Sequence, residues 1–260
     1  MSEVRYDVLG PLVVRRGGVE LDLGSPLQQR LLAGLLLHPN GPVPMTDLLE
    51  AGWQYATPDD GPELTREIIT ALRDLLDPHR VPGTDGTLIQ LSDGRYMLCA
   101  ARDNVDLFVF EDLIASVPEI RARDHLLEAS NRIRRALALW RGPLLEGHNG
   151  PLFDPVRARL EEGRLDVLDL YYEIELKRGF HHAILPDLSA NVARYPLREN
   201  LRATFLLTLY RTGRQFDAMQ QYVEIRDRLW RLNGRQPSYE LQELARRIAA
   251  WDQSLLREPG

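Results

Sequence analysis

Cysteine is nearly absent from this chain of 260 residues, and so are long apolar segments. The only cysteine, Cys99, cannot form an intrachain disulfide or a zinc site built from several cysteines, and it fits a reducing compartment. No run of about 18 uncharged apolar residues occurs, so we expect no membrane span. Residues 1–20 lack a basic start followed by an apolar core, which argues against a secretory signal. The sequence therefore predicts a cytoplasmic protein without membrane contact.

Motifs of catalytic, metal and cofactor sites are also missing. The chain has no nucleophile elbow, phosphate-binding loop, dinucleotide fingerprint or HExxH motif. His181 and His182 are adjacent, so on a helix their side chains point about 100° apart and do not clamp one metal ion. Cys99 stands alone in a strand-like run, which favours a packed side chain over a catalytic thiol. We therefore expect no catalytic residue, no metal and no cofactor.

What the sequence does contain is a set of three short predicted helices between residues 24 and 76. Ser25 before Pro26 is typical of a helix start, because a serine oxygen caps a backbone amide and proline suits the first turn. Leucines then recur on one face until the segment HPNGP at 38–42 ends the helix. A second helix is predicted at 46–53 and a third at 63–76. This pattern is typical of a helix-turn-helix core, whose third helix would enter a DNA groove.

Short strand-like runs flank these helices. Before them, alternation and a Gly17-Gly18 turn predict strands at 4–9, 12–15 and 19–23. After them, residues 87–91 and 96–100 surround Ser92-Asp93-Gly94-Arg95, and Asp-Gly is a strong signal for a short hairpin. We expect this hairpin to form the wing of a winged helix, with Arg95 at or near its tip.

The segment VLGPLVVRRGGVELDLGSPLQQRLLAGLLLHPNGPV at 8–43 resembles the start of the Streptomyces antibiotic regulatory proteins. Three later segments resemble the same family, namely ALALWRGPLL, YPLRENL and YRTGRQFDAM. The resemblance implies a mainly α fold with a small β part. It implies a winged-helix domain of the response-regulator type at 1–101, and an all-helical bacterial transcriptional activator domain at 102–260.

The second predicted domain has a tetratricopeptide-like pattern. Helices are predicted near 106–116, 122–140, 153–178, 181–194, 198–212, 215–232 and 238–251, with breaks that include Pro118. Gly179 and Gly213 each follow a predicted helix and are 34 residues apart, which is the period of a tetratricopeptide repeat. Glycine can end a helix in a left-handed conformation. We therefore expect a stack of helix pairs.

The function implied by the resemblance is transcriptional regulation of a secondary-metabolite gene cluster, such as one for antibiotic biosynthesis. Family members would bind promoter DNA as homodimers and recruit RNA polymerase through the helical domain. In this sequence Arg66, Thr70 and Arg73 on the third helix would read DNA, because arginine and threonine can bind base edges or phosphates. Arg95 in the wing and Arg30 in the first helix would contact the DNA backbone.

The charge distribution opposes part of this interpretation. Residues 1–100 contain eight arginines and 14 acidic residues, a net charge of −6, which is the net charge of the whole chain. Attraction to phosphates normally supplies most non-specific DNA affinity. Two alternatives therefore stay open. The chain could have lost DNA binding and act as a small-molecule or peptide binder, or as an enzyme of the pathway. It could also be an adaptor that binds another regulator.

Arginines are densest between residues 121 and 141. Six of them lie there, at positions 121, 123, 132, 134, 135 and 141. They would either line an ordinary solvent-exposed helix face or form a patch for an anionic partner.

Overall fold

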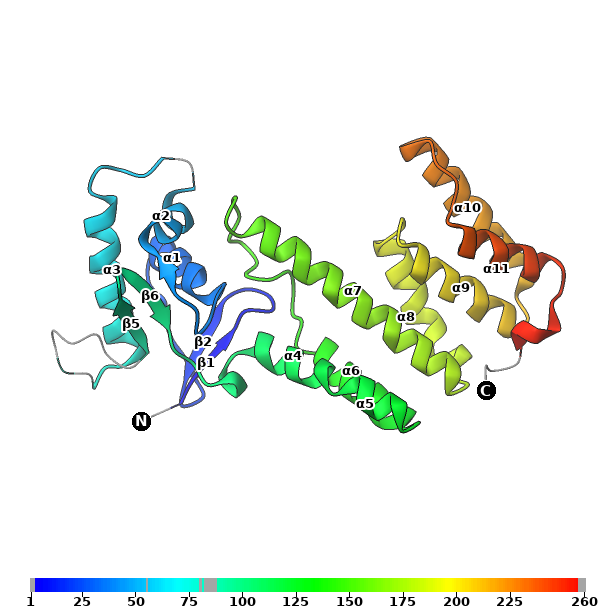
Figure 1. Ribbon diagram of the computed structural model, residues 1–260, viewed down its shortest axis with the longest axis horizontal. Helices are drawn as coiled ribbons and strands as arrows, with labels where there is room; N and C mark the ends of the chain where they lie inside the picture. Colours follow the sequence, from blue (N-terminus) through cyan, green and yellow to red (C-terminus); the bar gives the residue numbers. More distant parts are fainter. Residues whose placement is uncertain (1–2, 55, 80, 82–87, 257–260) are drawn as a thin grey trace. The chain divides into compact units, whose positions relative to one another are not determined.

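The computed structural model describes residues 3–54, 56–79, 81 and 88–256. The described chain is mainly helical with two small antiparallel sheets, as predicted (Figure 1). It divides into two compact units. The first comprises residues 1–116 and 135–164, and the second residues 117–134 and 165–260. Both later boundaries fall inside helices, α6 (Leu126–Leu137) and α7 (Asp154–Lys177).

The first sheet of the first unit has the strand order β1-β2-β3. The strands are β1 (Val4–Asp7), β2 (Val13–Arg16) and β3 (Val19–Glu20). In the antiparallel register Tyr6 lies opposite Val14, and both side chains are buried. Val8 and Leu9 were predicted to continue the first strand, but their amides donate to the carboxylate of Asp106 instead. The first strand therefore ends at Asp7, although the two following side chains are fully buried.

Helices α1 (Pro26–Leu36), α2 (Met45–Trp53) and α3 (Gly61–Leu76) confirm the three predicted helices. At the start of α1 a capping box forms, in which Ser25 Oγ accepts from the Gln28 amide and Gln28 Oε1 accepts from the Ser25 amide. Leu31, Leu32, Leu35 and Leu36 are fully buried. Because α1 packs against both α2 and α3, these leucines form the centre of the helix-turn-helix core.

The second sheet holds the predicted wing. It has the order β4-β6-β5, with β4 (Val43–Pro44), β5 (Ile89–Ser92) and β6 (Arg95–Leu98). Asp93 and Gly94 have φ angles of 49° and 72°, as a two-residue hairpin turn of type I′ requires. Thr87, predicted to begin the hairpin, lies outside the described residues, as does most of the preceding loop.

Segments from the second half of the sequence complete the first unit. After the short helix η1 (Arg102–Asn104) comes α4 (Asp106–Ala115), whose first residue binds the two amides described above at 2.8 and 3.0 Å. The segment after α6 then returns to the first sheet. The amides of Arg141, Leu145 and Glu146 donate to the carbonyls of Leu9, Val8 and Gly10 at 2.7, 2.8 and 2.9 Å. This unit defined by packing extends beyond the predicted domain 1–101, which stays a prediction about sequence families.

The second unit is a stack of helices around an apolar core. Besides parts of α6 and α7 it contains α5 (Val117–Ala122), α8 (His181–Arg194), α9 (Glu199–Arg211), α10 (Gln215–Asn233), α11 (Tyr239–Ala249) and η2 (Gln253–Leu256). Helix α9 packs against α8, α10 and α11.

The two glycines that suggested a repeat occupy equivalent turns. Gly179 has φ 80° and Gly213 has φ 78°. The amide of each glycine donates to the carbonyl three residues earlier, at 3.1 and 3.0 Å. The amide after each donates to the carbonyl five residues before it, at 3.0 and 2.8 Å. This repeated arrangement supports the tetratricopeptide-like interpretation of the helix pairs α7–α8 and α9–α10.

Two predicted features of the helical part were wrong. The helix expected at 122–140 is shorter and begins only at Leu126, because Asp124 has a left-handed φ of 58° and separates α6 from α5. The break expected at Pro118 lies earlier, at Ser116. Proline is tolerated in the first turn of a helix, where its missing amide costs no hydrogen bond, and Pro118 occupies this position in α5.

Candidate nucleic-acid interface

The third helix has one buried and one exposed side. Its buried residues are Gly61, Thr65, Ile68, Ile69, Leu72 and Leu76. Leu64 and Leu75, predicted to be buried, are only half-buried. Thr65 takes a core position because its hydroxyl donates to the carbonyl of Gly61 at 2.8 Å, which satisfies the buried oxygen.

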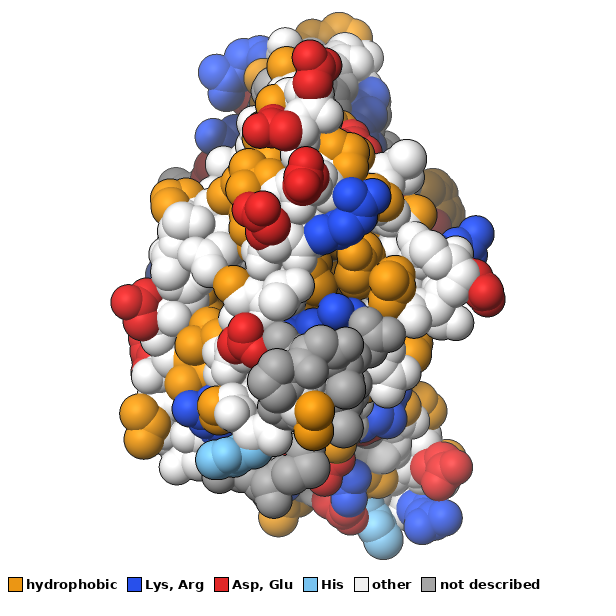
Figure 2. All heavy atoms as spheres, turned by 90° about the vertical axis from the view of Figure 1, so that its left-hand side faces the viewer, with side chains coloured by type: hydrophobic (Ala, Val, Ile, Leu, Met, Phe, Trp, Pro, Cys, Tyr) orange, Lys and Arg blue, Asp and Glu red, His pale blue; other side chains and the backbone are white. Residues whose placement is uncertain are grey.

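The exposed side of α3 is polar and mostly acidic. It presents Glu63, Arg66, Glu67, Thr70 and Asp74, besides Ala71. Figure 2, which views the molecule from the side on which α3 lies in Figure 1, shows red acidic side chains gathered in its upper centre, with blue basic side chains around them. Three carboxylates thus accompany one arginine where a DNA-reading helix would meet phosphates. The charge of this surface disfavours non-specific DNA affinity.

Arg66 and Thr70 lie one turn apart on the exposed side. Arg66 is exposed. The hydroxyl of Thr70 donates to the carbonyl of Arg66 at 2.9 Å, a bond that turns it toward its own helix. The oxygen can still accept a hydrogen bond. These two side chains form the most accessible part of the predicted reading surface.

Arg73 and Arg95 are associated with the wing. Arg73 is half-buried, and its Nε donates to the carbonyl of Ile89 in β5 at 2.9 Å. Arg73 therefore ties α3 to the hairpin. Arg95 is exposed at the start of β6, directly after the Asp93-Gly94 turn. Its side chain lies near the tip of the hairpin, as predicted, on a strand paired with both neighbours.

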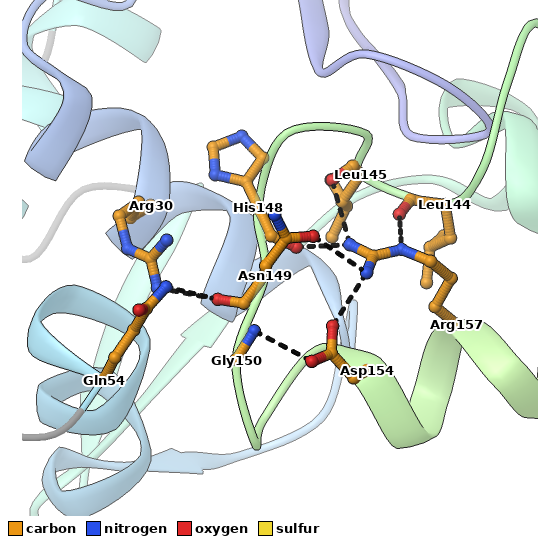
Figure 3. A network of polar contacts seen from close by, with 9 residues as sticks. All are labelled: Arg30, Gln54, Leu144, Leu145, His148, Asn149, Gly150, Asp154 and Arg157. Carbon is orange, nitrogen blue, oxygen red and sulfur yellow. Dashed lines mark hydrogen bonds and ion pairs between the residues drawn. The ribbon is translucent and has the colours of Figure 1, made fainter.

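Arg30 makes several intramolecular contacts. Its Nε donates to the carbonyls of Ala51 and Gly52 at 2.7 and 3.3 Å. Its Nη2 donates to the carbonyl of Asn149 at 3.2 Å, and Figure 3 shows these two residues beside each other. The guanidinium also lies 5.5 Å from the ring centre of Phe153. Burial lowers the pKa of Arg30. Arg30 thus joins α1 to α2 and to the segment before α7, apart from the α3 surface.

The segment around Asn149 is held by a second arginine that sequence patterns did not reveal. Arg157 donates to the carbonyls of Leu144, Leu145 and His148, and to the carboxylate of Asp154 at 2.8 Å (Figure 3). Gln54, directly after α2, donates to the Asn149 carbonyl at 2.6 Å. Most partners in this network are backbone carbonyls, which any residue type supplies. No residue pattern could therefore have identified the network.

Comparison with known proteins fits this architecture. The model of the bacterial transcriptional activator domain matches residues 105–249. The regulatory protein DnrI of Streptomyces peucetius is 32% identical over 260 residues, covering 98% of this chain and 95% of DnrI. The chain belongs to the Streptomyces antibiotic regulatory protein family of transcriptional regulators.

Other relatives of this family are longer. The regulatory protein AfsR of Streptomyces coelicolor is 36% identical over 252 residues, and this chain spans only 25% of its length. A structure of Mycobacterium tuberculosis EmbR in complex with a low-affinity phosphopeptide superposes with a TM-score of 0.90. It shares 24% identity and covers 98% of this chain and 69% of the EmbR chain. The predicted fold, a winged helix followed by a helical activator domain, is confirmed.

Four of the six arginines in the arginine-rich region of this family member form ion pairs, and Arg141 does so with Asp106 at 3.7 Å. In the second unit Arg121 pairs with Glu173 at 2.9 Å, Arg123 with Glu119 at 3.9 Å and Arg132 with Glu128 at 3.2 Å. Arg135 and Arg141 belong to the first unit. These contacts favour ordinary solvent-exposed arginines over a patch for an anionic partner.

No membrane span or metal cluster stands out in the part of the chain that the structure describes. No helix there is both long and apolar enough to cross a bilayer. Nor do three or more histidine, cysteine, aspartate or glutamate side chains gather there in a way that could hold a metal ion.

Proposed function

We propose that this family member regulates a secondary-metabolite gene cluster by binding promoter DNA through its winged helix. The observation that carries the proposal is the exposed side of α3, which is tied to the β5–β6 hairpin through Arg73 and Ile89. An exposed helix beside a wing suits insertion into the major groove. The similarity to DnrI along almost all of both chains supports the same role.

The five predicted residues would act in different ways. Arg66 and Thr70 would contact base edges or phosphates, because both are exposed on α3. Arg95 would contact a phosphate from the wing. Arg73 would chiefly hold the wing in place, since its Nε is bonded to Ile89. Arg30 would contact the DNA backbone only through those N–H groups that are not already bonded to α2 and Asn149.

The remaining partners follow from the family resemblance. The helical part would contact RNA polymerase, and two copies of the chain would act together on the promoter.

The acidic α3 surface supports a second candidate function, in which the chain keeps the regulator fold without binding DNA. Glu63, Glu67 and Asp74 would repel phosphates. The chain would then act through a protein, peptide or small-molecule partner.

Fluorescence anisotropy separates the two candidates. The full chain is titrated against DNA from promoters near its own gene, at about 50 and about 200 mM salt, with and without competitor DNA. For the regulator we expect binding that survives competitor and weakens with salt. Arg66→Ala should weaken this binding about tenfold, because a specific arginine contact is worth about 1–3 kcal/mol.

The matched control is Arg246→Ala, which removes the same charge from α11 in the second unit. Arg246 is 70% exposed and pairs only locally with Glu243. Equal effects of the two substitutions would mean that α3 is not the reading surface. No binding at micromolar concentrations of folded protein would leave the second candidate.

A further inference from the structure

Helix α10 carries apolar residues on two opposite sides. On one side Ala218, Ile225 and Leu229 are fully buried in the core of the second unit. On the other side Phe216, Val223 and Trp230 are 83%, 41% and 59% exposed. Large aromatic side chains with this exposure are unusual on a solvated helix, and an apolar line of this kind marks an interaction surface.

The exposed residues form one line along the helix, because seven residues are close to two helical turns. Phe216 is seven residues before Val223, and Trp230 is seven residues after it. The half-buried Met219 lies beside this line. We call Phe216, Met219, Val223 and Trp230 the α10 stripe. Trp251, 65% exposed, adjoins its first half and lines a groove of about 550 Å³ with Phe216, Met219 and Val223.

We infer that the α10 stripe is the contact surface for a second copy of this chain, with the two α10 helices antiparallel. The inference deepens the proposed function, in which two copies act together. It rests on a surface outside the predicted DNA contacts. The stripe is symmetric about Val223, with one aromatic residue at the same spacing on each side.

A twofold axis that passes between the two Val223 side chains relates the two copies. Antiparallel pairing places Val223 against Val223 of the second copy. It also places Phe216 against Trp230 of the second copy, and Trp230 against Phe216. Each aromatic ring then meets another ring, an arrangement that stabilises an interface beyond the burial of area alone. An isologous contact of this kind is the commonest interface in homodimers.

The charges beside the stripe favour the same orientation. Asp217 near the start of α10 and Arg231 near its end lie on the same flank, since fourteen residues are close to four turns. Antiparallel pairing brings Asp217 of each copy near Arg231 of the other. Asp217 now pairs with Arg214 at 2.6 Å, an exposed and therefore weak ion pair that can exchange partners.

The available area suits a weak dimer. An aromatic side chain offers about 200 Å². With the exposed fractions of Phe216, Trp230 and Trp251, each copy then contributes roughly 400 Å² from aromatic rings alone. Two copies would bury about 800 Å² from these rings and somewhat more with Met219 and Val223, which is in the range of weak complexes. We expect dissociation in the micromolar range without DNA, and tighter association when both copies bind one promoter.

Sedimentation of the full chain without DNA, at about 1 to 100 µM, tests the inference. The wild-type chain should form a dimer in this range. Val223→Asp and Val223→Arg should each raise the dissociation constant at least about tenfold, because each places two like charges together on the axis. An equimolar mixture of the two variants should dimerise again, since the charges are then opposite.

Recovery in the mixture is the decisive result, because only a residue that contacts itself across a twofold axis gives it. The control is Val19→Arg, which adds a charge at a valine of β3 that is 68% exposed in the first unit and should leave the dimer unchanged. Circular dichroism checks that each variant is folded.

A wild-type chain that stays monomeric at about 100 µM would overturn the inference, as would a dimer that neither Val223 variant weakens or a mixture that does not recover. Because the test contains no DNA, these outcomes are independent of the proposed function. A monomeric chain that still binds promoter DNA would contradict the stripe alone, and a dimer that binds no DNA would contradict the regulator alone.

Discussion

In the first unit a few polar groups join segments that are far apart in the sequence. The second unit instead repeats one type of helix pair, joined by the same glycine turn, around an apolar core. Asp106 joins α4 to the first strand, and Arg157 fixes the segment that leads into α7. In the second unit Gly179 and Gly213 make the same turn 34 residues apart. Loss of one polar anchor should therefore be costly in the first unit, while the second depends on the conformation of its turns.

The outward surfaces of the two units differ in the same way. The exposed side of α3 is charged and has a carboxylate on almost every turn, whereas the exposed side of α10 carries Phe216, Val223 and Trp230. A helix with one apolar side buries that side in the core of its domain. A helix with two apolar sides has a second side that only another molecule can bury. The contrast assigns α3 to solvent or nucleic acid and α10 to protein.

The largest effect on this comparison is expected for Asp106→Ala. The substitution leaves the buried amides of Val8 and Leu9 without their acceptor, which should cost the first unit about 2–4 kcal/mol. Hydrogen exchange resolved by peptide should show lost protection in β1 and α1 but not in α8–α11. The matched control is Asp112→Ala, which breaks an exposed pair with Arg102 and should leave the stability of the first unit nearly unchanged. Equal effects of both substitutions would refute the role of Asp106 as an anchor.

The same carboxylate should make the first unit less stable as pH rises. Burial raises the pKa of Asp106 to about 6, more than the two backbone donors and Arg141 lower it. The folded state therefore holds this proton more tightly than the unfolded chain, whose aspartate has the ordinary pKa of 3.8. The stabilisation is complete below pH 3.8 and is lost as pH rises through about 6.

Urea unfolding across this pH range measures the effect, with Asp106→Asn as a variant that does not titrate. Between about pH 4 and pH 7 the unfolding free energy of the wild type should fall by about 2–3 kcal/mol relative to the variant. Parallel pH profiles for the two proteins would show that Asp106 does not titrate in this window.

Two glycine-to-alanine substitutions test whether the turns of the second unit need glycine. Gly213 has a left-handed φ of 78° and open space around its α-carbon, so alanine there should cost about 1 kcal/mol through backbone conformation alone. Gly163, inside α7, also has open space but no left-handed φ, and alanine there should stabilise by about 0.5–1 kcal/mol. Thermal unfolding of the two variants should give shifts of opposite sign. Shifts of the same sign would remove the argument from the turn.

Much of this fold could be predicted because it depends on local signals. The Ser25-Pro26 start of α1, the Asp93-Gly94 hairpin and the glycines of the repeat each have a backbone requirement that few residue types satisfy. The division at Asp124 could not be predicted in this way, because aspartate adopts a left-handed conformation only occasionally. The extent of the first unit depends on contacts between residues about 100 positions apart, which no local pattern records.

The candidate site was predicted less completely than the fold. The sequence placed Arg66 and Thr70 on the exposed side of α3, because helical periodicity decides which side is buried. It could not show that Arg73 and Arg30 are bonded to backbone carbonyls, since side-chain direction depends on the packed structure. The α10 stripe was also missed. Its aromatic spacing is that of a core helix, and only the structure shows which of the two apolar sides is covered.

The smallest effect is expected from removing one negative charge on the exposed side of α3. Glu67→Gln removes one exposed carboxylate from α3 while keeping the shape of the side chain. If α3 lies against DNA, the promoter affinity should rise about two- to fivefold at low salt and less at higher salt, because the repulsion is exposed and screened. The control is Glu240→Gln on α11, an exposed residue of the second unit that has the same charge. Anisotropy titrations at two salt concentrations measure both variants. Equal promoter affinities of the wild type and Glu67→Gln would mean that the acidic side of α3 stays away from the phosphates. The exposed side of α3 would then be charged because it faces solvent, not because it faces nucleic acid.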